Sequence, residues 1–148
     1  MYIYKTIYPM KTHYEKIQVK GTFFTMKGLY LFYMPIMVPY NKISDKAKEQ
    51  GFLVKGGNKF NGIIEKATSF GRGWIGVEIQ DVETSNANII RINQEFNSYE
   101  YIGNYKGIGQ AMKEIMMDYP DILETYNLYL NDPTTTPESE LKTLILFR

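Results

Sequence analysis

The C-terminal part of the chain contains Tyr126-Asn-Leu-Tyr-Leu-Asn-Asp-Pro-Thr-Thr-Thr-Pro-Glu-Ser-Glu-Leu-Lys-Thr-Leu-Ile-Leu-Phe147, which predicts two strands joined by a turn. Residues 126–130 alternate aromatic or aliphatic side chains with polar ones, the period of a half-buried strand. Asn131-Asp132-Pro133 predicts the turn, because the first two side chains can bond nearby backbone amides and the proline ring fixes φ. The mainly β-branched and aliphatic run from Glu140 to Phe147 predicts the second strand. We therefore expect a hairpin here.

The rest of the chain alternates strand and helix patterns. A helix is predicted over residues 40–50, and a second over 106–119, where apolar residues recur at i, i+3, i+4 and i+7 spacing. The segment 23–38 is so uniformly apolar that its periodicity does not separate a buried helix from a strand. The predicted strands lie at 2–8, 12–19, 60–68, 73–82 and 89–101, the last as one long strand or a bent pair.

A polar linker is predicted at Glu83-Thr-Ser-Asn-Ala-Asn88, close to the midpoint of the sequence. On both sides of it the predicted order is strand, helix, strand, strand. We therefore predict one domain over 1–148 made of two pseudo-repeats, about 1–83 and 88–148, related by internal duplication. The 148 residues, 44% of them hydrophobic, are enough to bury one core.

Charge and residue types exclude several classes of function. The net charge is +1, with 17 basic and 16 acidic residues scattered along the chain, so direct binding to nucleic acid is not expected. The absence of cysteine excludes disulfides, thiolate catalysis and cysteine zinc sites. His13 is the single histidine and is expected to fill a strand position, so no metal site is predicted. The glycine-rich segments lack the spacing of a phosphate-binding loop, so no cofactor is predicted.

No signal peptide is visible, and we expect a cytoplasmic protein. The most apolar segment, residues 28–40, contains Pro35 and Pro39 and is shorter than the ~20 residues of a membrane-spanning helix, so no membrane partner is predicted. Aromatic residues make up 15% of the chain, with 13 tyrosines. This enrichment suits either a pocket for a planar ligand or a tyrosine-rich core.

The second half of the chain resembles the GyrI-like, or AraC-type, effector-binding domain. The motifs are Ile102-Gly-Asn-Tyr-Lys-Gly-Ile-Gly-Gln-Ala-Met112, Leu128-Tyr-Leu-Asn-Asp-Pro133 and Thr136-Pro-Glu-Ser-Glu-Leu-Lys-Thr143. The family places a Gly-Pro-Tyr turn, a helix, Tyr-Leu-Asn-Asp-Pro and Pro-Glu-Glu-Leu-Arg-Thr-Glu in this order. In the first half, Trp74-Ile-Gly-Val-Glu-Ile79 resembles the corresponding hairpin only loosely.

The resemblance implies an α+β fold of two β-α-β-β units, whose curved antiparallel sheet surrounds a central groove. Such domains bind hydrophobic, often cationic aromatic compounds in bacterial multidrug-responsive transcription regulators. They also occur as stand-alone proteins, which include a gyrase modulator and hydrolases of cyclopropane-bearing toxins. The chain has no spare length for a helix-turn-helix, so we expect a stand-alone small-molecule-binding module. The alternatives are such a hydrolase, or a protein-interaction module that binds gyrase or a regulator.

The chain departs from the family at Leu144, where the family places the acidic residue that meets a ligand's positive charge. We therefore expect a largely apolar groove and assign no catalytic residue. Glu78 lies four residues after Trp74 on the same strand face and could supply the missing carboxylate. The alternative is that Glu78 points to solvent while Trp74 belongs to the core. The predicted ligand-binding residues are Trp74, Glu78, Tyr99, Tyr101, Tyr129 and Leu144.

Overall fold

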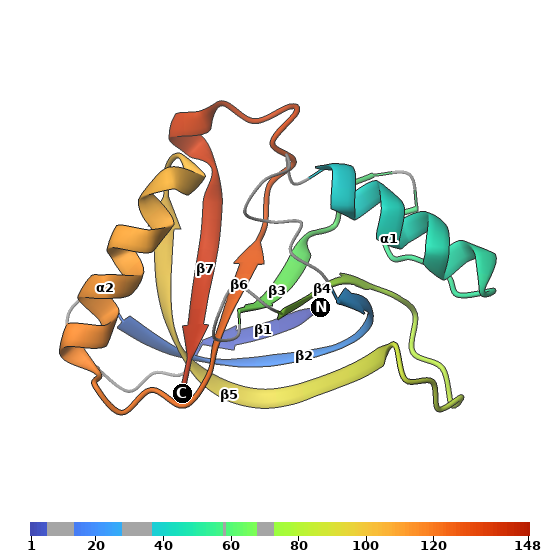
Figure 1. The fold of residues 1–148 in the computed structure, drawn as a ribbon, viewed down its shortest axis with the longest axis horizontal. Coiled ribbons are helices and arrows are strands. Elements are labelled where there is room, and N and C mark those ends of the chain that lie inside the picture. The colour runs from blue at the N-terminus through green and yellow to red at the C-terminus, as the bar shows by residue number, and fades with distance from the viewer. Residues whose placement is uncertain (6–13, 28–36, 58, 68–72) are drawn as a thin grey trace.

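The computed structural model describes residues 1–5, 14–27, 37–57, 59–67 and 73–148 (Figure 1). Its strands are β1 (Tyr2–Lys5), β2 (Tyr14–Lys27), β3 (Ile63–Ala67), β4 (Gly73–Glu78), β5 (Ile89–Ile102), β6 (Thr125–Tyr129) and β7 (Lys142–Phe147). Its helices are α1 (Met37–Glu49) and α2 (Ile108–Asp118), with short 3-10 turns at Tyr105–Gly107 and Glu138–Glu140. Within these ranges, neither helix has the length and apolar character needed to cross a membrane.

The strands form one antiparallel sheet in the order β1-β2-β4-β3-β6-β7-β5. The long strands β2 and β5 also pair with each other, from Tyr14 opposite Tyr99 to Phe24 opposite Ile89. This pairing closes six of the strands into a ring, and β1 is attached outside it at the edge of β2. In Figure 1, β6 and β7 stand between the two helices, while β2 and β5 curve below them. The chain is therefore an α+β protein built on a strongly curved sheet.

The two faces of the ring bury different clusters, because successive side chains on a strand point to opposite faces. The inner face collects apolar side chains from all six strands and none from a helix. The outer face is covered by the helices in two separate places. The inner cluster comprises Ile17, Val19, Phe23, Ile64, Ile92, Phe96, Tyr126, Leu128, Leu144 and Leu146. On the outer face, α1 packs with Phe24, Ile63, Ile75, Val77 and Tyr129, and α2 packs with Tyr14, Ile145 and Phe147.

Both halves have the predicted order, as β2-α1-β3-β4 and as β5-α2-β6-β7. Their origin by duplication stays a prediction. The region 89–102 is one continuous strand, which decides between the two alternatives for it. Of the ambiguous segment 23–38, residues 23–27 continue β2 and residues 37–38 begin α1, while 28–36 lie outside the described residues. His13 and residues 6–8 of the first predicted strand also lie outside them.

The C-terminal hairpin is confirmed, with β6 and β7 paired from Thr125 opposite Phe147 to Tyr129 opposite Thr143. The Asp132 carboxylate accepts hydrogen bonds from the amide and the hydroxyl of Thr134, at 2.8 and 2.6 Å. These bonds stabilise the turn in the manner expected of an aspartate before a proline. The motif therefore stabilises the backbone of the turn.

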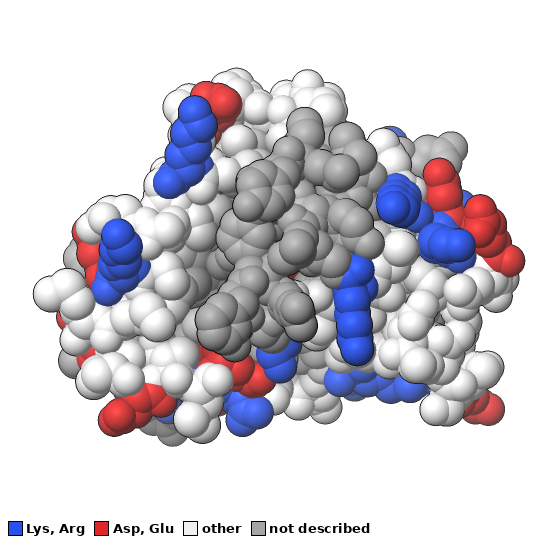
Figure 2. Space-filling view, viewed as in Figure 1, with Lys and Arg blue, Asp and Glu red and all other residues white. Residues whose placement is uncertain are grey.

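The described surface carries mixed charge. On the face shown in Figure 2, lysine and arginine side chains are scattered among acidic and uncharged ones and do not gather into one patch. This distribution follows from the interspersed signs in the sequence.

Candidate functional site

The six predicted ligand-binding residues are divided between the two faces of the ring. Leu144 belongs to the inner cluster and Trp74 packs against it. Glu78 shares the face of Trp74 because it lies four positions further along β4. The three tyrosines lie on the outer face with the helices. The structure therefore places the two sets on opposite faces of the sheet, and their role in ligand binding stays a prediction.

Leu144 lies among apolar side chains of the inner face. The Leu144 side chain is buried within the inner cluster, and Leu128 lies opposite it on β6. Trp74 packs its indole against the ring of Tyr126, with the ring centroids 5.9 Å apart in an edge-on arrangement. Both side chains thus pack among the apolar residues of the inner face.

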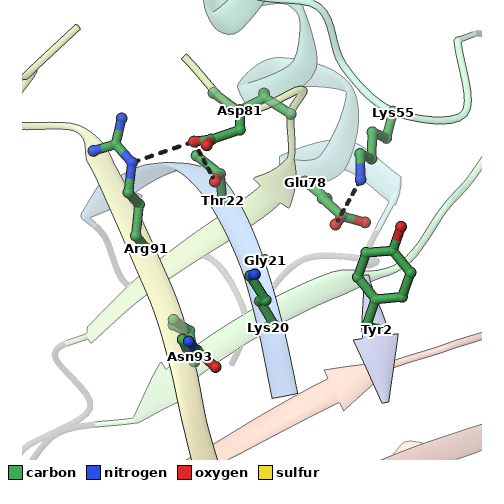
Figure 3. Close-up of a pocket in the computed structure, with 11 residues that line it drawn as sticks. Tyr2, Lys20, Gly21, Thr22, Lys55, Glu78, Asp81, Arg91 and Asn93 are labelled. Atoms are coloured by element: carbon green, nitrogen blue, oxygen red, sulfur yellow. Dashed lines mark hydrogen bonds and ion pairs between the residues drawn. The ribbon is translucent and has the colours of Figure 1, made fainter. Parts of the chain in front are cut away.

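Glu78 is buried but already fully engaged (Figure 3). Its carboxylate lies 2.6 Å from the α-ammonium of Met1 and 3.4 Å from the ammonium of Lys55. Asn61 donates a further hydrogen bond to the same carboxylate at 3.1 Å. Glu78 therefore does not point to solvent, yet it has no remaining capacity for the cation of a ligand.

Tyr99 and Tyr101 pack against the α2 cluster. The hydroxyl of Tyr101 donates to the backbone carbonyl of Asn104 at 2.6 Å, which fixes the turn before α2. Glu100 points to the other face, is exposed, and lies 3.7 Å from the ammonium of Lys142. The hydrogen bond of Tyr101 therefore stabilises the start of α2, and Glu100 forms an ion pair at the surface.

Tyr129 leads to an acidic residue that the sequence-based prediction missed. Glu65 on β3 is only 7% exposed, and its register partner on β6 is Asn127. The Tyr129 hydroxyl donates to Oε1 of Glu65 at 2.8 Å, and the Asn127 amide donates to the same oxygen at 2.9 Å. Oε2 of Glu65 has no hydrogen-bond partner among the described residues. Two neutral donors thus hold the carboxyl by one oxygen.

Burial sets the protonation of this pair. Removal from water raises the pKa of Glu65 above its ordinary value, although the hydrogen bonds from Asn127 and Tyr129 oppose the shift. Burial also raises the pKa of Tyr129 well above its ordinary value, and the negative charge of Glu65 adds to that effect. A buried acid with a shifted pKa beside tyrosines is a candidate functional group.

Two further side chains complete what we call the Glu65 cluster, which comprises Glu65, Asn127, Tyr129, Tyr105 and Thr143. The ring of Tyr105 meets that of Tyr129 edge-on, with centroids 5.2 Å apart. Thr143 lies opposite Tyr129 in the β6–β7 register and is fully buried, and its hydroxyl has no hydrogen-bond partner among the described residues. The cluster lies where β3 of the first half pairs with β6 of the second.

Metal ligation is not indicated for the part of the chain that the structure describes, which contains no group of three or more histidine, aspartate or glutamate side chains placed to hold a metal ion. The chemistry available to the Glu65 cluster is therefore that of a carboxyl, an amide and hydroxyls beside aromatic rings. Such groups can bind a cation, accept hydrogen bonds and stack on a planar ligand.

Comparisons with known proteins place the fold. No protein-family model and no curated protein matches the sequence. An uncharacterized conserved protein from Listeria innocua matches with a TM-score of 0.56 and 13% identity, over 93% of this chain and 92% of that one. The protein SAV2435, solved bound to tetraphenylphosphonium, matches with a TM-score of 0.52 and 14% identity, over 90% and 92% of the two chains. A hydrolase from Listeria innocua matches with a TM-score of 0.50 and 14% identity, over 93% and 91%. At these identities the likeness shows a shared fold.

Proposed function

We propose that this chain is a small-molecule-binding protein of the GyrI-like type, and that its ligand is a hydrophobic cation bound at the Glu65 cluster. The observation that carries the proposal is the buried carboxyl of Glu65, which is held by two neutral donors. None of the interactions that shift its pKa comes from a positively charged group of the described residues.

A largely buried carboxylate without a cation is costly, because it has lost most of its water and gains no compensating charge. A ligand that brings a positive charge next to Oε2 of Glu65 would remove that cost. Glu78 provides the contrast within the same protein, since its equally buried carboxylate is neutralised by Met1 and Lys55. Of these two buried carboxylates, Glu65 is the one with capacity for an external cation.

The aromatic side chains supply the second requirement. Tyr129 bonds the carboxyl through its hydroxyl, and the ring of Tyr105 packs against that of Tyr129. Aromatic faces attract cations and stack on planar groups. The free hydroxyl of Thr143 adds a polar contact that a ligand could satisfy. Apolar area and one charge are the combination that a lipophilic cation needs.

The comparisons support small-molecule binding by a protein of this fold, but they do not identify the residues that bind the ligand. The three motifs of the second half resemble the GyrI-like family, and a structural neighbour of the same fold was solved with tetraphenylphosphonium, an aromatic cation. Because that neighbour is 14% identical, the assignment of Glu65 rests on the contacts described above.

Isothermal titration with tetraphenylphosphonium and with its neutral analogue triphenylphosphine oxide tests the function. We expect saturable binding of the cation and at least tenfold weaker binding of the neutral compound, a difference of about 1.4 kcal/mol. Absence of saturable binding by either compound would overturn the proposed function. Equal affinity for both would retain an apolar site and remove the cation preference.

A further inference from the structure

A cavity of about 260 Å³ lies beside β2, and no residue of the Glu65 cluster lines it (Figure 3). It forms because two strands share one edge of β2. Strand β1 pairs with β2 as far as Lys20, and β4 pairs with it from Phe23 onward, so that Gly21 faces the interval between them. The walls of this interval are partly apolar. They include Ile79, which directly follows β4, and Ile92 on β5.

Gly21 lines the cavity and is closely packed on the side where a side chain would lie. A Cβ atom at this position would lie 2.9 Å from the ring of Phe23 and 3.3 Å from the carboxylate of Glu78. The first distance is shorter than any relaxed carbon contact, so a larger residue at this position would displace the ring of Phe23.

Each wall carries a cation held in place by a carboxylate. On one wall, Glu78 lies 3.4 Å from the ammonium of Lys55. On the opposite wall, Asp81 accepts from Nε of Arg91 at 3.3 Å and from the hydroxyl of Thr22 at 2.9 Å. The hydrogen bond from Thr22 and the charge of Arg91 lower the pKa of Asp81, so this carboxylate stays ionised.

Arg91 is oriented by more than its ion pair. Its Nη2 donates to the backbone carbonyls of Val82 and Thr84, the latter at 3.4 Å. Its Nη1 has no acceptor among the described residues. An arginine fixed by Nε and Nη2 and open at Nη1 presents a donor that is already positioned for an acceptor.

The unused hydrogen-bonding groups of the cavity are mostly donors. Both oxygens of Glu78 accept hydrogen bonds, and Asp81 retains one oxygen. Lys20 also lines the cavity and has no partner among the described residues, and Lys55 uses one of its three donor positions. Three side-chain cations and two carboxylates thus line the cavity, and each carboxylate is paired with one of these cations.

We propose that this cavity binds a small organic oxyanion, a carboxylate or a phosphate, between Lys20, Lys55 and Arg91. An oxyanion accepts several charge-assisted hydrogen bonds at once, which matches the excess of donors. The volume suits a ligand with a single ring or a short chain, whose apolar part would lie on Gly21 and Ile92. The site is separate from the cation site proposed at Glu65 and takes the opposite charge.

Amide NMR titrations with inorganic phosphate, benzoate and benzylammonium test this site. We expect saturable shifts at Gly21, Thr22 and Arg91 with at least one of the two anions and none with benzylammonium. A response to phosphate alone identifies a phosphate site, and a response to benzoate identifies a carboxylate site with an apolar wall. Preferential binding of benzylammonium, or no saturable shift with either anion, would overturn the proposal.

Two exposed cations allow variants that leave the core intact. Lys20→Gln and Arg91→Gln should each weaken anion binding about five- to tenfold, because each removes a charged donor. Lys113→Gln, the same change on an exposed position of α2, should leave it unchanged. Tetraphenylphosphonium binding should be unaffected in all three variants. Anion affinity equal to that of the wild type in both cavity variants would place the anion elsewhere and refute the site.

Discussion

Replacement of Glu65 by glutamine isolates the charge on which the proposed function depends. Glutamine has the same shape and can still accept at Oε1 from Tyr129, so the change removes charge and little packing. A carboxylate and a cation about 5 Å apart attract each other by about 3 kcal/mol at an effective dielectric constant of about 20. Part of this attraction is used to ionise Glu65, whose pKa is raised by burial. We therefore expect tetraphenylphosphonium to bind Glu65→Gln about 10- to 100-fold more weakly.

The pH dependence provides an independent readout of the same group. The cation prefers ionised Glu65, so binding releases a proton when the free protein holds one. Affinity for tetraphenylphosphonium should therefore rise with pH, by up to about tenfold per unit, until the pH passes the raised pKa of Glu65. In Glu65→Gln the affinity should not vary over this range. Isothermal titration in buffers of different ionisation enthalpy measures both the affinity and the released proton.

A charge-matched control separates a local effect from a change in net charge. Glu100→Gln removes an exposed carboxylate that lies near Lys142, and it should leave the affinity for tetraphenylphosphonium unchanged. Equal affinity of wild type and Glu65→Gln at neutral pH would refute the assignment of Glu65, even where binding itself is present. Equal losses in both variants would show that only net charge matters.

Four further outcomes concern stability and are measured by chemical or thermal unfolding. Because the folded state raises the pKa of Glu65 above its value in the unfolded chain, the wild type should lose stability relative to Glu65→Gln as pH rises from about 4.5 through the raised pKa, and parallel unfolding curves across pH would contradict this. Tyr129→Phe should cost about 1–2 kcal/mol by removing the 2.8 Å hydrogen bond to the buried acid, a loss that unchanged urea midpoints would exclude. Glu78→Gln should destabilise by about 3 kcal/mol, because it leaves the buried α-ammonium of Met1 without its partner, while tetraphenylphosphonium affinity stays constant. Gly21→Ala should cost about 1–3 kcal/mol, because the added Cβ would lie 2.9 Å from the ring of Phe23. Gly109→Ala on α2 should stabilise by about 0.5 kcal/mol, because its Cβ would meet nothing within 4 Å. A change of the same sign in both variants would contradict the packing described.

Local patterns predicted the elements of the second half closely. The alternation over 126–130 corresponds to β6 at Thr125–Tyr129, and the apolar spacing over 106–119 corresponds to α2 at Ile108–Asp118. In both cases the signal lies within the segment, since the side chains that face the core recur at the period of the element. The segment 23–38 had no such period, and its division between β2 and α1 depends on contacts that the segment does not encode by itself.

The site was harder to predict because a residue's partners come from distant parts of the chain. Glu65 meets Asn127 and Tyr129 only through the pairing of β3 with β6, across a separation of 62 and 64 residues. Glu78 was chosen because it shares a strand face with Trp74, and that part of the reasoning agrees with the register. The sequence did not show that Lys55 and Met1 would occupy the Glu78 carboxylate.

A sequence signal for Glu65 does exist, and its physical basis explains why it points to function. Glu65 occupies the strand face of Ile63, whose side chain is completely buried under α1, so the alternation of β3 assigns an acidic residue to an apolar position. An acid at such a position needs either a cation from the protein or a reason to remain without one. The described neighbours of Glu65 provide only neutral donors, and the buried hydroxyl of Thr143 nearby is also unused. Two unfulfilled polar groups on one face, where the halves of the sheet meet, are what a site for an external polar partner requires. The same test applied to Glu78 gives the opposite answer, so burial of an acid is informative only together with the charge of its neighbours.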